Sequence, residues 1–299
     1  MQENLHLMVF GDQLKMPLIS MTGYNSLIKA DYLGWHRHNG FELTFALKSS
    51  VIWEIEDDSK QHLSSGHVSL VSPHVAHRGM DDVTHPCEMV YIVFEPLIND
   101  ALSNTPFSAS DMEDIHTIFS SAGNKMIKAN DFLFYLLNEY RKTLFLYVAK
   151  SSHYMVESQL RGLLSQIILQ CALSFKDNEE LQLSREIQIA VEYMNEHFTD
   201  NIEIKHVADH IHKSTTFLYN TFKKEIGQAP NEYILRLRLE KACKELKSSD
   251  KSITEISFDA GYTSTQYFSK MFNRYTGRTP SSYRKNQNID DLVSIKYYP

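Results

Sequence analysis

An internal repeat constrains the fold of this 299-residue chain more strongly than any other feature of its sequence. Residues 209–233 align without a gap with residues 259–283, and seven of the 25 aligned positions are identical. Average composition would give about one or two identities over that length. The C-terminal third therefore contains one structural unit twice, with the identical pairs Asp209/Asp259, Ser214/Ser264, Thr215/Thr265, Phe222/Phe272, Gly227/Gly277, Pro230/Pro280 and Tyr233/Tyr283.

Each copy of the repeat predicts a helix-turn-helix. A short helix is expected over residues 204–211 and again over 253–260. A tight turn follows each, in which Ser214 or Ser264 is placed to cap the next helix. A unit of two helices about a short turn can place its second helix in the major groove of DNA.

The segment between the two copies predicts one connecting helix. Residues 231–247 have an apolar side, and at ~1.5 Å per residue they span about 25 Å. Gly227 and Gly277 fall where the two second helices should end. A single connecting helix could therefore set two recognition helices about one DNA turn apart, ~34 Å. A helical repeat that binds no DNA is the alternative.

The charge distribution singles out the same region. The chain has a net charge of −7, and residues 1–183 hold 13 basic and 22 acidic side chains. Residues 184–287 hold 16 basic and 13 acidic side chains. A mildly basic C-terminal third in an acidic chain indicates a nucleic-acid partner for that part alone.

The N-terminal third predicts β-structure. Short runs rich in β-forming residues are separated by polar breaks, which is typical of a small barrel or sandwich. The expected strands are residues 42–47, 51–56, 68–71 and 89–94.

Helical patterns follow over residues 108–122, 131–150 and 156–176. The last of these carries a wide apolar stripe at three- and four-residue steps. The stripe either packs on the β domain or pairs with a second subunit, and both can hold together. Its members are Leu160, Leu163, Leu164, Ile167, Ile168, Cys171 and Phe175.

Other classes of protein are disfavoured. No run of 18 apolar residues is present, so no membrane span is expected. Cys87, Cys171 and Cys243 lie far apart and form no CxxC pair, which favours reduced thiols in a cytoplasmic protein. No nucleophile with a base, phosphate loop or paired-carboxylate site is evident, so we do not expect an enzyme.

The C-terminal third resembles the AraC/XylS family of bacterial transcription regulators. The resemblance covers residues 184–286, and its most specific stretches are 259–264 (DAGYTS), 267–272 (YFSKMF) and 277–284 (GRTPSSYR). It implies an α+β chain with four parts. These are a cupin-like effector-sensing β-barrel (1–107), a helical dimerisation and linker segment (108–183), a double helix-turn-helix DNA-binding domain (184–287) and a C-terminal tail (288–299).

The resemblance also implies partners and DNA contacts. The partners are promoter double-stranded DNA, a small effector that is by default a carbohydrate or related metabolite, a second copy of the chain, and RNA polymerase if the protein activates. Asn and Gln can pair with adenine, and Thr can touch a thymine methyl. The implied base-facing residues are Thr216, Tyr219, Asn220, Thr265, Gln266, Ser269 and Lys270, and the implied phosphate contacts are Lys213, Lys223, Lys224, Arg274 and Arg284.

A group of histidines marks the β domain. His36, His38 and Glu42 have the spacing HxHxxxE and would share one face of a strand, and an antiparallel neighbour could supply His77. The group resembles the two cupin motifs, although Ser72 stands where Pro is usual and His74 where Gly is usual.

Three interpretations of this group stay open. It lines an effector site together with Trp35, it holds a transition metal such as Fe, Mn, Ni or Zn, or it is structural. A metal-dependent cupin enzyme with a helical appendage is the alternative function.

Overall fold

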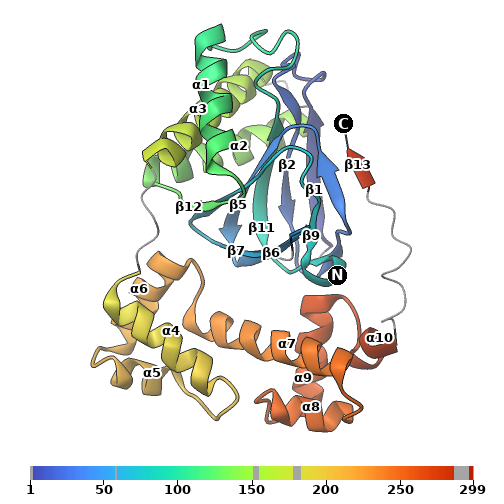
Figure 1. Ribbon diagram of the computed structural model, residues 1–299, viewed down its shortest axis with the longest axis vertical. Helices are drawn as coiled ribbons and strands as arrows, with labels where there is room; N and C mark the ends of the chain where they lie inside the picture. The colour runs from blue at the N-terminus through green and yellow to red at the C-terminus, as the bar shows by residue number, and fades with distance from the viewer. Residues whose placement is uncertain (1–2, 58, 151–154, 178–182, 286–295, 299) are drawn as a thin grey trace.

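A computed structural model describes residues 3–57, 59–150, 155–177 and 183–285, together with the backbone of 296–298. It contains a β domain with three covering helices and, below it, a domain of helices alone (Figure 1). Most of the predicted tail 288–299 lies outside the described residues. No described helix is both long enough and apolar enough to cross a membrane.

Two main sheets form the N-terminal domain, and their pairing is antiparallel apart from β13 on β4. The larger sheet has the order β1 (Leu5–Phe10), β2 (Ile19–Ser26), β11 (Glu88–Phe94), β5 (Phe41–Lys48), β8 (His67–Val71) and β12 (Met126–Lys128). The second has the order β13 (Lys296–Tyr298), β4 (His36–His38), β9 (His77–Gly79), β6 (Ser50–Ile55) and β7 (Lys60–Ser64). A short ribbon pairs β3 (Asp31–Tyr32) with β10 (Val83–Thr84).

Side-chain alternation on β5 explains the two layers. Phe41, Leu43 and Phe45 belong to the core shared with the helices. The intervening positions point the other way, toward the second sheet, because successive side chains of a strand alternate between faces. Ala46 accordingly joins Trp53 of β6 in a smaller core. The face that carries Glu42 is therefore the interior face between the sheets.

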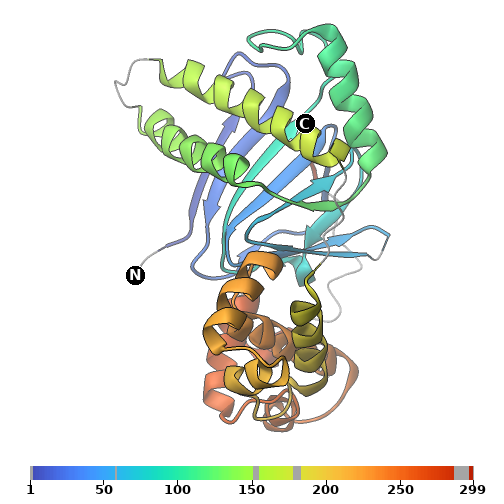
Figure 2. The same cartoon turned by 90° about the vertical axis from the view of Figure 1, so that its left-hand side faces the viewer.

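Three helices cover the outer face of the larger sheet (Figure 2). They are α1 (Ala109–Ala122), α2 (Asp131–Val148) and α3 (Val156–Asp177). They bury their apolar sides in the same core as the sheet, and β12 lies between α1 and α2 along the chain. Residues 1–107 and 108–183 thus share one core, and β12 is a strand inside a segment for which the sequence predicted only helices.

The apolar stripe of α3 packs on the β domain of its own chain, which confirms the first of the two interpretations. Leu164 is 0% exposed, and Leu160, Ile167, Ile168, Cys171 and Phe175 belong to the same core. Only Leu163 is partly exposed. These side chains are covered within one chain, so they are not free to form the predicted subunit contact.

We expect Leu164→Glu to unfold the N-terminal domain instead of producing folded monomers. The change places a charge without a partner in a closed core, and the free energy of unfolding should fall by about 4 kcal/mol or more. Urea denaturation measures this. Leu173→Glu is the matched control, because Leu173 lies on the same helix and is 45% exposed. A folded Leu164→Glu monomer of ordinary stability would contradict the expectation.

Seven helices form the C-terminal domain around two small cores, one for each copy of the repeat. The long helix α7 contributes side chains to both cores and so connects the copies rigidly. The helices are α4 (Arg185–His197), α5 (Ile204–His210), α6 (Thr215–Ile226), α7 (Pro230–Ser248), α8 (Ile253–Asp259), α9 (Thr265–Thr276) and α10 (Pro280–Lys285).

The predicted ends of the recognition helices are confirmed. The hydroxyl of Ser214 accepts a hydrogen bond from the backbone N–H of Phe217, and Ser264 caps α9 in the same way. Gly227 and Gly277 follow the two helices at φ 80° and φ 70°, a left-handed conformation that favours glycine. The two copies of the repeat therefore fold alike.

Candidate functional site

The predicted base-facing residues lie on the N-terminal halves of α6 and α9. Thr216, Tyr219 and Asn220 are exposed on α6. Gln266 and Lys270 are exposed on α9, and Ser269 is half-buried. Polar groups on the first turns of two exposed helices are what major-groove recognition requires.

Thr265 differs from the other predicted positions. It is half-buried, and its hydroxyl lies 3.1 Å from the hydroxyl of Ser257, which is fully buried in α8. This contact ties the two helices of the second copy together. Gln266 is also engaged, since its side-chain oxygen accepts a hydrogen bond from the hydroxyl of Ser264 at 3.0 Å.

The predicted phosphate contacts fall into two groups. Lys223, Lys224 and Arg274 are exposed near the C-terminal ends of α6 and α9. Lys213 is also partly exposed, although it lies 3.3 Å from the carboxylate of Glu186.

Arg284 is held inside its own domain. Its guanidinium donates to the carbonyl oxygen of Lys251 at 2.6 Å, and the residue is half-buried. This bond holds α10 to the segment before α8, which favours a structural role over contact with phosphate.

Tyr267 is a feature of this surface that the sequence analysis did not select. It is 55% exposed on α9, next to Gln266. Its ring is therefore accessible beside the predicted base-facing residues. Its position in the sequence could have indicated this exposure. Tyr267 directly precedes Phe268 and so lies outside the buried side of the helix that Phe268 and Phe272 form.

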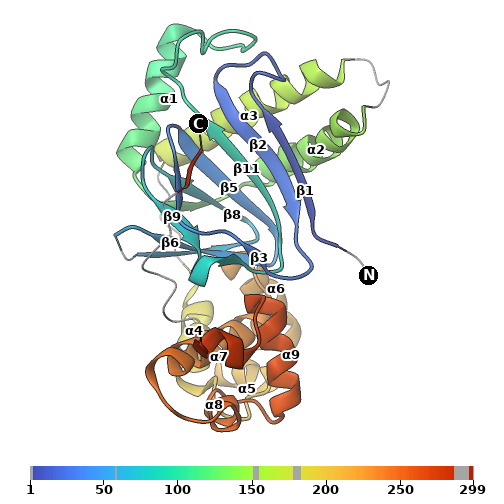
Figure 3. The ribbon, with the colours of Figure 1, turned by 90° about the vertical axis from the view of Figure 1, so that its right-hand side faces the viewer.

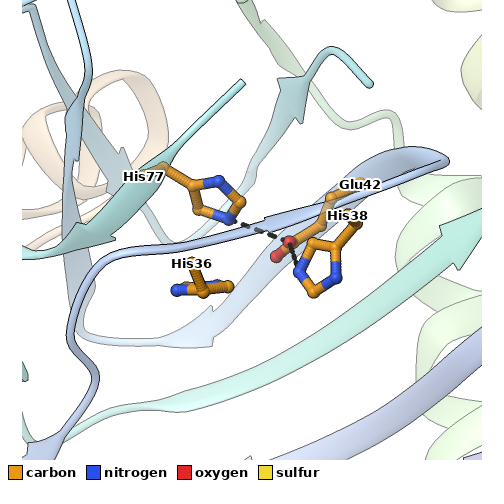
Figure 4. Close-up of side chains that lie close together, drawn as sticks. All are labelled: His36, His38, Glu42 and His77. Carbon is orange, nitrogen blue, oxygen red and sulfur yellow. Dashed lines mark hydrogen bonds and ion pairs between the residues drawn. The ribbon is translucent and has the colours of Figure 1, made fainter. Parts of the chain in front are cut away.

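The structure brings all four members of the histidine cluster together (Figure 4). One potential ligand atom from each of His36, His38, Glu42 and His77 lies within 4.8 Å of the others. One Glu42 oxygen is 3.0 Å from Nε2 of His38 and 3.0 Å from Nε2 of His77. The sequence thus identified four side chains that meet between the two sheets.

The path of the chain through the cluster differs from the sequence expectation. His36 and His38 lie on β4, but Glu42 lies on β5 in the other sheet. The chain bends at residues 39–40, where Gly40 packs so tightly that an added Cβ would lie 2.5 Å from the carbonyl oxygen of Phe94. The tight bend, not a shared strand face, brings Glu42 back to the two histidines.

The loop before His77 keeps the conformation that a glycine would favour. His74 has a φ of 64°, and its backbone N–H donates to the carbonyl oxygen of His38 at 2.8 Å. The left-handed conformation is uncommon for a residue other than glycine, although histidine is among those that tolerate it. Although His74 stands where the cupin motif usually has glycine, the loop therefore still lies close to β4.

Backbone carbonyls fix the orientation of two rings. Nδ1 of His36 lies 2.9 Å from the carbonyl oxygen of Gly34, and Nδ1 of His77 lies 3.1 Å from that of Val75. An Nδ1–H that donates to a carbonyl leaves Nε2 facing the cluster with its lone pair when the ring is neutral.

Burial and charge set the protonation of the cluster. Burial, together with the charge of His77, lowers the pKa of His36 to about 4, so His36 is neutral at pH 7. Burial alone would raise the pKa of Glu42, but its bonds to His77 and His38 outweigh this effect and hold the pKa well below the usual range. Burial would lower the pKa of His77, but the Glu42 carboxylate raises it. Glu42 and His77 therefore form a buried ion pair.

The donor set fits a transition metal. Three imidazoles and one carboxylate are ligands for Fe, Mn, Ni or Zn, and carbonyl contacts of the kind made by His36 and His77 are typical of metal-ligating histidines. The exposed fractions are 5% for His36, 5% for His38, 6% for Glu42 and 1% for His77. An ion needs far less room at these atoms than a sugar ring.

Trp35 is not part of the cluster. It is half-buried before β4, and the guanidinium of Arg78 lies 4.8 Å from the centre of its ring. This cation–π contact occupies one face of the ring that was predicted to line the effector site.

The C-terminal region matches a family of helix-turn-helix domains over residues 207–286. It is also similar to two curated bacterial proteins. The raffinose operon transcriptional regulatory protein RafR of Pediococcus pentosaceus is 32% identical over 112 residues, which are 38% of this chain and 40% of that protein. The transcriptional activator RhaS of Escherichia coli O157:H7 is 30% identical over 115 residues, which are 38% of this chain and 41% of RhaS.

The chain thus spans about two-fifths of the length of these curated relatives. Among solved structures, it is similar to the C-terminal domain of AraT, a response regulator from Geobacillus stearothermophilus. The two are 28% identical, with a TM-score of 0.35, and the match covers 38% of this chain and 96% of that domain.

Proposed function

We propose that this chain, whose C-terminal region is an AraC-type helix-turn-helix domain, is a sequence-specific transcription regulator that responds to a small effector. The observation that carries the proposal is the repeated unit. Two capped recognition helices, α6 and α9, present exposed polar residues and are joined through α7. RafR and RhaS are named as transcriptional regulators, and their similarity to this chain supports the same role.

The proposal assigns no catalysis to the chain. One relative, AdaA of Bacillus subtilis, is named as both a transcriptional activator and a DNA repair enzyme. It is 31% identical over 117 residues, which are 39% of this chain and 56% of AdaA.

A regulator of this kind binds promoter DNA in the cytoplasm and, as an activator, contacts RNA polymerase. The experiment that tests the proposal is binding of the full chain to the DNA upstream of its own gene, followed by fluorescence anisotropy. An affinity that depends neither on the DNA sequence nor on the salt concentration would contradict the proposal.

We further propose that the protein acts as a homodimer through the exposed side of α2. Phe132 and Tyr135 are 49% and 60% exposed on neighbouring turns, and Glu139 and Lys142 continue the same side as an ion pair. The stripe of α3 is unavailable, so α2 offers the better apolar surface. Sedimentation equilibrium of the full chain measures the oligomeric state.

The N-terminal domain is proposed to sense the effector, with a carbohydrate or related metabolite as its default class. The name of RafR, which refers to the raffinose operon, supports that class. The histidine cluster is the proposed response site, because its four polar side chains are held between the sheets.

A transition metal is the second candidate occupant, and the close burial of the four donors favours it. His36, His38, Glu42 and His77 would hold the ion. The bound ion would supply positive charge that replaces the proton shared by Glu42 and His77, and so would fix the distance between the two sheets.

We expect His38→Ala to abolish the effector response while DNA binding by the separate C-terminal domain persists. If the cluster holds a metal, purified protein should contain close to one transition metal per chain, and the variant should lose it because three ligands bind more weakly. Elemental analysis measures this. His6→Ala is the control, since His6 is about half exposed on β1. If His38→Ala keeps a normal effector response and the purified protein contains no metal, the cluster is structural.

A further inference from the structure

Both copies of the repeat lie below the β domain (Figure 1), and contacts from the β domain reach each of them. On the first copy, Nε2 of Gln228 lies 3.5 Å from the hydroxyl of Ser64. On the second copy, the carbonyl oxygen of Arg274 accepts a hydrogen bond from the backbone N–H of Ala30 at 3.1 Å. The β domain therefore holds the C-terminal ends of both recognition helices at once.

The turn after α6 shows how closely the domains approach. A Cβ added to Gly227 would lie 2.0 Å from the carbonyl oxygen of Ser65. Gly227 also has a positive φ, so its lack of a side chain serves both the helix end and the interface. The interface thus uses the residues that end the recognition helices.

Asp81 is the most strongly held residue of the interface. Its carboxylate accepts hydrogen bonds from the ammonium of Lys247 on α7 and from the hydroxyl of Tyr283 on α10. The side chain is only 15% exposed. Burial would raise the pKa of Asp81, but the bonds from Lys247 and Tyr283 hold it below its usual range, so the carboxylate is charged at pH 7.

The backbone around Asp81 is strained. Asp81 has a φ of 54° and Asp82 a φ of 65°. Two consecutive residues other than glycine in this region are uncommon, and such conformations persist only where the surroundings hold them. Lys247 and Tyr283 hold Asp81 in this conformation. Arg78 and the backbone N–H of Leu33 hold Asp82.

The same short segment begins in the histidine cluster. His77, four residues before Asp81, bonds Glu42 through Nε2 at 3.0 Å. Arg78 then donates from Nε to Glu54 at 2.7 Å and from Nη1 to Asp82 at 3.0 Å. The segment therefore begins at the histidine cluster, on the strand labelled β9 in Figure 3, and ends at the contact with the C-terminal domain. An occupant that takes Glu42 from His77 removes a contact at the start of this segment.

We propose that residues 77–82 form a latch, in which Asp81 restrains the DNA-binding domain through Lys247 and Tyr283 and the histidine cluster controls that restraint. The proposal rests on the proposed function, because it explains how an event between the sheets reaches the recognition helices. The closed latch lowers DNA affinity, because the interface holds the C-terminal domain, with its two rigidly connected copies, in one position against the β domain, and DNA binding favours another position.

The test compares the wild-type chain with Asp81→Asn and Lys247→Gln. Affinity for the DNA upstream of its own gene is measured by fluorescence anisotropy at one salt concentration. Both variants should bind about fivefold more tightly or better, which is the lower end of typical coupling between sites. Lys247→Gln is the sharper variant, because loss of a positive charge from the DNA-binding domain would by itself weaken DNA binding.

Lys244→Gln is the matched control. Lys244 is exposed on the same helix, three residues before Lys247, and its loss removes the same charge without touching Asp81. It should bind DNA no more tightly than the wild-type chain. Unchanged or weaker binding by both Asp81→Asn and Lys247→Gln, or an equal gain with Lys244→Gln, would overturn the latch.

A second measurement separates failure of the latch from failure of the proposed function. Hydrogen–deuterium exchange of α10 should rise in Asp81→Asn, because a neutral amide holds Tyr283 and Lys247 less strongly than the carboxylate does. If no variant binds DNA, the proposed function fails, and the exchange result alone decides whether the latch exists. Unchanged exchange would count against it.

A double-mutant cycle tests whether the histidine cluster controls the latch. Glu42→Gln keeps the shape of the side chain but removes its charge, and it should change DNA affinity in the wild-type background. The same change should have no effect in Asp81→Asn, where the latch is already open. Equal effects in both backgrounds, or no effect in either, would overturn the link between cluster and latch.

Discussion

Binding of the full chain to its target DNA should weaken about 150-fold between 50 and 200 mM salt. The chain as a whole is acidic, at −7, but the C-terminal region carries the exposed cations. Of the five predicted phosphate contacts, Lys213, Lys223, Lys224 and Arg274 stay available, because Arg284 is bonded within its domain. Four neutralised phosphates give a slope of about −3.6 in a plot of log affinity against log salt.

The change of this slope in single variants shows which residues contact phosphate. Lys223→Ala and Lys224→Ala should each reduce its magnitude by about one, since each removes one released counterion. Lys176→Ala serves as the control, because Lys176 is an exposed lysine on α3 of the other domain. A flat salt response would instead support a helical interaction protein with no role on DNA.

The C-terminal domain was predictable because its signals are local. A serine that caps a helix and a glycine that ends it act within a few residues, and both appear twice at the same offset. Ser214, Ser264, Gly227 and Gly277 therefore predicted the helix ends that the structure contains. His36, His38 and Glu42 were also predictable, since their residue types and short spacing carry the chemistry, and His77 was predictable from its place in the second cupin-like motif.

The features of the fold that were not predictable depend on contacts between segments that are distant in the sequence. The three residues of β12 form a strand only because β8 pairs with them, and no periodicity exists over so short a run. The stripe of α3 left two interpretations open, since an apolar face does not specify what covers it. Asp81 gave no signal at all, because its partners Lys247 and Tyr283 lie more than 160 residues away along the chain.

Base recognition should separate from phosphate binding on the recognition helices. Gln266→Ala and Asn220→Ala should each lose about 1–3 kcal/mol at the cognate site and less on random DNA, because an amide can bond both edge atoms of an adenine. Lys223→Ala should weaken binding to both DNAs about equally, since a phosphate carries no sequence information. Competition binding with cognate and random duplexes measures both losses.

Asn273→Ala is the matched control for the two amide variants. Asn273 is exposed on α9 like Gln266, but it lies near the C-terminal end of the helix, two turns from the first turn that enters the groove. Its loss should leave the ratio of cognate to random binding unchanged. If Gln266→Ala and Lys223→Ala changed the affinity for both DNAs in the same proportion, the base-facing assignment on α9 would be wrong, and Tyr267 would be the next residue on that helix to test.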